Sequence, residues 1–117
     1  PDTAWCTPTT TIGSGALQTA IGTGPGNTDA IIAATTTSAA KVIRDNRGSD
    51  WFLPSYDELD LMYKNLWAHA KGNLTGGNFW SSTEKDGTTA WNDFFYSGSW
   101  HAYTKSSTLQ VRAVRSF

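Results

Sequence analysis

The chain contains little cysteine and no long apolar run. Cys6 is the single cysteine among 117 residues, which excludes an intrachain disulfide and a zinc site built from several cysteines. Its neighbours Trp5 and Pro8 favour a buried thiol over an intermolecular bridge. No apolar stretch approaches the roughly 18 residues that a membrane span needs, so we expect no membrane insertion.

Charge is also scarce, at 16% of residues against roughly 25% in average soluble domains. Nine Lys and Arg against ten Asp and Glu give a net charge of -1, so the chain lacks the positive field of nucleic-acid-binding domains. We expect no nucleic-acid partner, and any affinity for an anionic ligand must come from a local cluster of cations or from oligomerisation. The abundance of Thr, Ser, Gly and aromatic residues is typical of a secreted, β-rich binding module.

The sequence divides near residue 26. Residues 1–26 are rich in Thr and Gly and include the loop-like run Gly22-Thr23-Gly24-Pro25-Gly26. We expect this segment to be a lead-in, with a contact in an oligomer as a second reading, and residues 27–117 to form a binding domain. Because the chain starts at Pro1 without an initiator Met or a signal peptide, we expect it to belong to a longer protein.

A first helix is predicted over residues 28–46. Asn27 or Thr28 can cap its start, and Gly48 ends it. The residues at helical spacing that should face the core are Ile32, Thr36, Ala39 and Ile43. The run Thr35-Thr36-Thr37 has low helix propensity, so tertiary packing must hold this helix together.

The clearest local signal is the capping box Ser55-x-x-Glu58. It follows a short buried strand at 51–53 and opens a second helix that Gly72 ends near residue 71. The apolar stripe of this helix is Leu59, Met62, Tyr63 and Leu66.

The remaining sequence predicts strands joined by turns at Asp86-Gly87 and Ser97-Gly98. The predicted strands are 79–82, 91–96, 100–104 and 109–115, of which 91–96 is apolar on both faces and should be central. The predicted fold class is therefore α+β, with two helices packed on a mainly antiparallel sheet.

Five separated segments together resemble one family. They are Asp50-Trp51-Phe52-Leu53-Pro54-Ser55 with Glu58-Leu59, Phe79-Trp80-Ser81-Ser82-Thr83, Ala90-Trp91, Lys105, and Val111-Arg112-Ala113-Val114-Arg115. In this order and spacing, residues 30–117 resemble the Lcl C-terminal domain family, named for the C-terminal domain of a collagen-like bacterial adhesin.

The resemblance implies a C-type-lectin-like fold on the bacterial cell surface or outside the cell. It also implies an adhesin that binds sulfated polysaccharides, glycosaminoglycans such as heparin or chondroitin sulfate, in host cell attachment, biofilm formation and virulence. A collagen-like stalk is a triple helix, so a domain attached to one would form a homotrimer.

The residues support no enzyme site, cofactor or metal. His69 and His101 are the only histidines, and no nucleophile elbow accompanies either of them. The formylglycine-generating oxidases of the same fold neighbourhood need a pair of active-site cysteines. Trp91-Asn92-Asp93 resembles the calcium-ligating tripeptide of C-type lectins, but the partner motif of those lectins is absent, so a packed strand is the better interpretation.

Arginine forks and lysine point charges are the groups that bind sulfate. The candidates for a polyanion are Lys41, Arg44, Arg47, Lys64, Lys71, Lys105 and Arg112, and those for stacking on sugar rings are Trp100, His101 and Tyr103. Cations at helix ends are also explained by the helix dipole alone, and Arg115 fits a paired structural arginine as well as a ligand contact. Two rival functions stay open: a neutral-sugar lectin that uses Trp100, Tyr103 and Asn92, and a structural trimerisation module of a collagen-like stalk.

Overall fold

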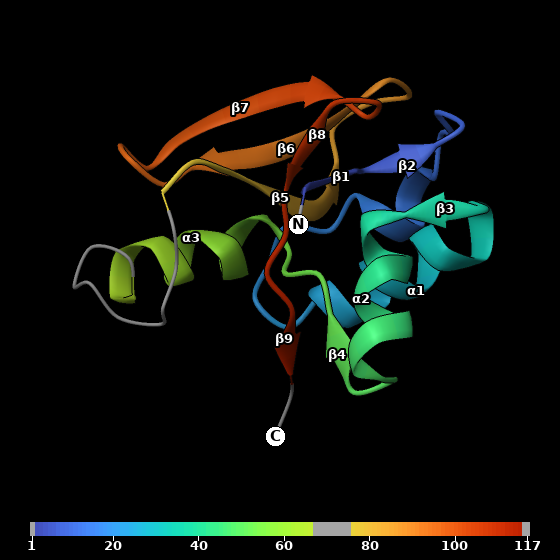
Figure 1. Ribbon diagram of the computed structural model, residues 1–117, viewed down its shortest axis with the longest axis horizontal. Helices are drawn as coiled ribbons and strands as arrows, with labels where there is room; N and C mark the ends of the chain where they lie inside the picture. Colours follow the sequence, from blue (N-terminus) through green and yellow to red (C-terminus); the bar gives the residue numbers. More distant parts are fainter. Residues whose placement is uncertain (1, 67–75, 116–117) are drawn as a thin grey trace.

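A five-stranded sheet forms one layer of the molecule, and helices cover one side of it (Figure 1). The computed structural model describes residues 2–66 and 76–115. The sheet consists, in spatial order, of β1 (Asp2–Ala4), β8 (Thr108–Gln110), β5 (Asn78–Glu84), β6 (Thr89–Phe94) and β7 (Ser99–Thr104). Its strands pair antiparallel except for β5 with β8, so the predicted α+β class with a mainly antiparallel sheet is confirmed.

The region predicted as a single first helix forms two helices, so that part of the prediction is wrong. α1 spans Gly24–Ala34, and α2 spans Ala39–Arg47 after the short strand β3 (Thr37–Ser38). Thr35 is extended, with φ −125° and ψ 155°, as the low helix propensity of the threonine run favours. Ser38 then starts α2, because its hydroxyl accepts a hydrogen bond from the Lys41 amide at 3.0 Å.

The helix predicted after Ser55 is α3 (Tyr56–Asn65), and its capping box is present. The Glu58 carboxylate accepts a hydrogen bond from the Ser55 amide at 2.8 Å, and also from the Gly22 and Gly24 amides at 2.9 and 3.1 Å. One carboxylate therefore fixes both the start of α3 and the loop before α1. The helix ends at Asn65, earlier than predicted, and Gly72 lies outside the described residues.

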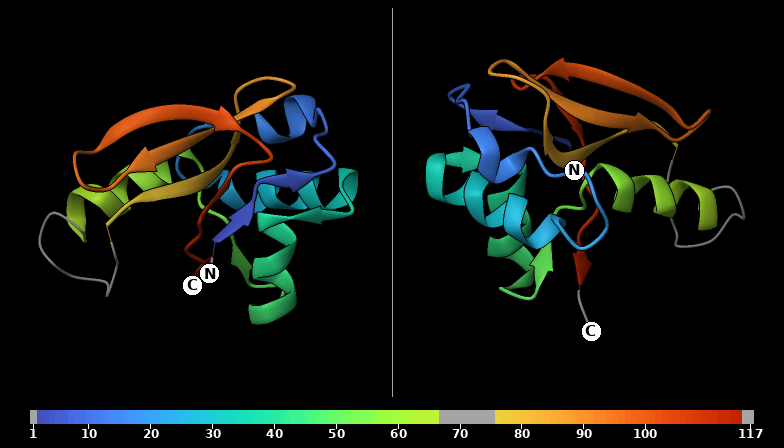
Figure 2. Two further views of the ribbon diagram at one scale, coloured as in Figure 1. Left: turned by 45° about the horizontal axis from the view of Figure 1, so that its top comes forward. Right: turned by 180° about the vertical axis from the view of Figure 1, so that it is seen from behind.

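The last predicted strand, 109–115, is divided between two sheets. β8 belongs to the large sheet, whereas β9 (Val114–Arg115) pairs with β4 (Trp51–Phe52) in a separate two-stranded sheet. A second small sheet joins β2 (Cys6–Thr7) to β3. Figures 1 and 2 show β4 and β9 between α2 on one side and α3 on the other.

The core lies between the large sheet and the helices. A larger apolar cluster includes Trp5, Cys6, Ile31, Ile43 and Trp80, and a smaller one under α3 consists of Leu59, Phe79 and Phe95. Cys6 is buried, as predicted. The segment before residue 27 thus contributes side chains to the same core as the rest of the chain. Among the described residues, no helix has the length and apolar character to cross a membrane.

Candidate functional site

The half-buried ring of Trp51 lies at the centre of the best candidate site. Strand β4 places Trp51 opposite Arg115 of β9. The guanidinium carbon of Arg115 lies 5.7 Å from the centre of the Trp51 ring, and that of Arg47, the last residue of α2, lies 5.5 Å from it. Both distances are within the range of cation–π attraction, which holds each guanidinium against the ring.

Gly48 makes this arrangement possible. Its φ of 111° lies in the left-handed region that glycine tolerates best, and its amide donates to the Arg44 carbonyl at 2.9 Å. The Gly48 carbonyl then accepts a hydrogen bond from the Trp51 amide at 3.2 Å. The chain therefore turns back at once, and Trp51 lies beside the end of the helix that carries Arg47.

Two hollows adjoin Trp51 and share Trp51, Arg112 and Ala113 in their walls. The first hollow, of about 580 Å³, lies toward α2 and is completed by Val42, Ile43, Asn46, Arg47 and Val111. The second hollow, of about 430 Å³, lies toward α3 and is completed by Met62, Leu66, Val114 and Arg115. We call the two hollows, with Trp51, Arg47, Arg112 and Arg115, the arginine cleft.

The cleft is cationic. Arg47, Arg112 and Arg115 are all exposed, and within residues 2–66 and 76–115 neither Arg47 nor Arg112 forms an ion pair with a carboxylate. Guanidinium groups carry five donors in a planar fork that matches carboxylate and sulfate oxygens. The arrangement can therefore bind anionic groups beside the Trp51 ring.

Three other predicted ligand cations lie in ion pairs. Lys41 contacts Asp45 at 3.1 Å, Arg44 contacts Asp29 at 2.9 Å, and Lys64 contacts Asp60 at 2.8 Å. Arg44 also donates a hydrogen bond from Nε to the Trp51 carbonyl, and this bond helps to hold the backbone of Trp51 in place. Lys71 lies outside the described residues.

The prediction that Lys105 binds a polyanion is wrong, because its side chain is buried. Its side chain is 0% exposed, and its ammonium forms an ion pair with the equally buried Glu84. The same ammonium donates to the carbonyls of Thr10 at 2.7 Å and Gly87 at 3.2 Å. It also lies 4.9 Å from the centre of the Trp5 ring. Lys105 is therefore a structural residue that no solution ligand can reach.

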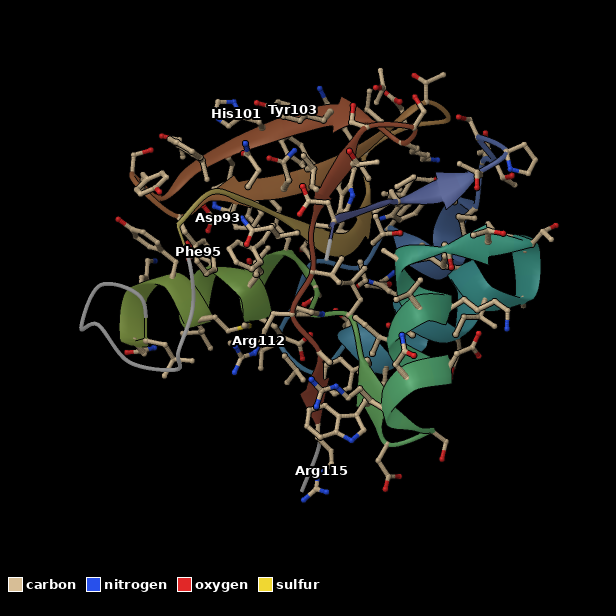
Figure 3. All side chains as sticks on the ribbon, viewed as in Figure 1. Asp93, Phe95, His101, Tyr103, Arg112 and Arg115 are labelled. Carbon is tan, nitrogen blue, oxygen red and sulfur yellow. The ribbon has the colours of Figure 1, made fainter. Side chains whose placement is uncertain are left out.

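The predicted stacking residues lie on β7, away from the arginine cleft. Figure 3 shows His101 and Tyr103 along β7 at the top of the molecule and Arg112 and Arg115 toward the opposite end. Both rings are exposed, with centres 5.8 Å apart. Trp100 faces the other way and stacks on Tyr56 with ring centres 3.6 Å apart, so one face of its indole is covered. Asn92, which a lectin for neutral sugar would use as a polar contact, is completely buried.

Sequence reasoning found Arg47 and Arg112 but did not group them with Trp51 and Arg115. The signal was present in part, because Trp51 and residues 111–115 belong to the segments that carry the family resemblance. What was missing is the pairing of β4 with β9, which brings these segments together.

No set of three or more His, Cys, Asp or Glu side chains in the part of the chain that the structure describes is arranged to hold a metal ion. No protein-family model matches the chain, and no curated protein matches its sequence.

Proposed function

We propose that this domain binds sulfated polysaccharides through the arginine cleft and serves in adhesion rather than catalysis. The observation that carries the proposal is that two exposed arginines, Arg47 and Arg115, lie over one half-buried tryptophan, while a third, Arg112, lines both adjoining hollows. Sulfate groups accept paired hydrogen bonds from guanidinium forks. The two hollows that adjoin Trp51 give neighbouring sugar units a place to lie.

The affinity of one cleft is expected to be low. Exposed charge pairs contribute only about 1 kcal/mol each, and the cleft offers three arginines. A homotrimer would let one long polymer contact several clefts, which raises the apparent affinity through effective concentration. Trimeric presentation on a collagen-like stalk, as the family resemblance implies, is therefore part of the proposal, together with a location on the cell surface or outside the cell.

The experiment measures binding of the domain to heparin and chondroitin sulfate fragments of increasing length at low and moderate salt. Arg112→Ala should weaken binding about fivefold, because it removes one charge-assisted contact of about 1 kcal/mol. Lys41→Ala is the matched control, since it removes an exposed cation that lies outside the cleft and is paired with Asp45. Affinity should rise with fragment length and fall with salt.

Each rival has its own outcome. Binding that ignores salt and is displaced by a neutral monosaccharide would replace the proposal with a lectin for uncharged sugar. A trimeric mass by size-exclusion chromatography with light scattering, combined with no binding on a glycan array, would replace it with a structural trimerisation module. An equal loss in the Lys41 and Arg112 variants would refute the arginine cleft as the site.

A further inference from the structure

Asp93 is a buried carboxyl group to which the proposed function assigns no role. It lies in β6, is 0% exposed, and neither of its carboxyl oxygens has a hydrogen-bond partner within residues 2–66 and 76–115. Its partners in the sheet are Phe79 of β5 and Trp100 of β7. Figure 3 shows Asp93 and Phe95 on the side of the sheet that faces α3.

The groups that α3 presents to Asp93 are unfavourable for a charged carboxylate. Asp60 repels the Asp93 carboxylate. The pKa of the nearby Tyr56 phenol is raised by burial first, then by Asp60 and then by Asp93. The Asp57 carboxylate acts on Tyr56 in the same direction. Lys64, the cation on this helix, is paired with Asp60 and is exposed.

The strands around Asp93 supply no compensating cation. Lys85 lies over the ring of Trp91, 5.2 Å from its centre, and forms no ion pair with Asp93. His101 follows Trp100 in β7 and therefore points to the opposite face of the sheet. Burial first, and then Asp60, raise the pKa of Asp93 to about 7.

The same helix forms part of the arginine cleft. Met62 and Leu66 of the α3 region line the second hollow beside Arg112 and Arg115. Tyr56, at the start of α3, stacks on Trp100, which is the strand partner of Asp93. A change in the contact between α3 and β6 therefore also changes one wall of the cleft.

We propose that Asp93 is a protonation-controlled latch: as a neutral acid it allows α3 to pack on the sheet, and as a carboxylate it loosens α3 and the second hollow of the arginine cleft. The direction follows from the raised pKa. Below a pH of about 4 the Asp93 carboxyl is protonated in both the folded and the unfolded chain, so its full contribution to stability is present there. That contribution is lost as the pH rises from about 4 through about 7, the pKa of Asp93 in the folded chain. The effect on binding rests on the proposed function, whereas the effect on stability does not.

Thermal unfolding between pH 5 and pH 8.5 tests the latch. The wild-type melting temperature should fall by on the order of 10 °C as the pH rises through 7. Asp93→Asn, which mimics the neutral acid, should abolish this fall and melt above the wild type at pH 8. Asp60→Asn should reduce it, because the nearest repelling charge is removed. Asp45→Asn is the matched control, an exposed acid on α2 that should keep the wild-type profile.

Two results would overturn the latch. One is an Asp93→Asn profile with the wild-type slope. The other is a rise in wild-type melting temperature with added calcium at pH 8 that Asp93→Asn abolishes, since Asp93 would then hold a cation in place of a proton.

Heparin binding at pH 6 and pH 8 tests the coupling to the cleft. Wild-type affinity should fall about fivefold more than that of Asp93→Asn, which retains the same histidines and therefore controls for their titration. An equal fall in the two proteins would refute the coupling. If neither protein binds heparin at either pH while the stability profiles differ as expected, the proposed function fails and the latch on α3 stands.

Discussion

The replacement of Lys105 by Met gives the sharpest test of the core. The change keeps most of the aliphatic stem but removes the ammonium, which contacts Glu84 and donates to the carbonyls of Thr10 and Gly87. Glu84 would retain hydrogen bonds from the Ile12 and Gly13 amides, at 2.7 and 2.8 Å, but its buried charge would lose its counter-ion. The variant therefore loses contacts that hold the loop of residues 8–13 and the turn between β5 and β6.

The expected magnitude is large. Removing one partner of a buried ion pair costs about 3–5 kcal/mol, because the remaining charge is left uncompensated. Domains of this size are stable by about 5–15 kcal/mol, so the variant should lose a substantial share of its stability and melt roughly 10–25 °C lower.

Urea unfolding at fixed pH measures the effect, with Glu84→Gln and the double variant completing a thermodynamic cycle. The double variant should be more stable than the sum of the two single losses predicts, because it leaves neither charge buried alone. A loss below about 1 kcal/mol for Lys105→Met, or strict additivity, would refute the buried-pair account. Under conditions where Lys105→Met is folded, it should bind heparin as the wild type does, since Lys105 lies outside the arginine cleft.

Two further predictions concern packing. Native protein should not react with a thiol reagent at the buried Cys6 until it is unfolded, and a disulfide-linked dimer on non-reducing gels would contradict this. Gly24→Ala should cost about 1–3 kcal/mol in urea unfolding, because its methyl group would overlap Glu58 and lie 2.7 Å from the Phe52 ring. Gly26→Ala in the same helix meets nothing within 4 Å and should be neutral or stabilising, so an equal loss in both variants would refute the steric explanation.

The parts of the fold that depend on local chemistry could be predicted. The capping box at Ser55, the stop at Gly48 and the strands on either side of the Ser97-Gly98 turn all depend on residues near one another in sequence. The threonine run also indicated the break between α1 and α2, because threonine has a low helix propensity. The helical spacing of the core-facing residues across the break nevertheless favoured one continuous helix. Propensity proved the better guide there.

The site could be predicted only in part, because it depends on contacts between distant segments. β4 and β9 each have two residues, too few to show a periodicity, yet their pairing unites Trp51 with Arg115. The burial of Lys105, in the turn after β7, depends in the same way on Glu84 of β5. Sequence reasoning identified cations of the right kind but could not tell which of them meet.

The two residues of strand β4 have different roles: one packs in the core, and the other contacts the solvent. Phe52 points inward and is buried, whereas its neighbour Trp51 is half-exposed and bears the arginines. Positions 47 and 112, whose side chains are exposed, can therefore be changed to another charge pattern without redesigning the interior. If the arginine cleft binds as proposed, a library at positions 47 and 112 would explore new ligands on one unchanged scaffold.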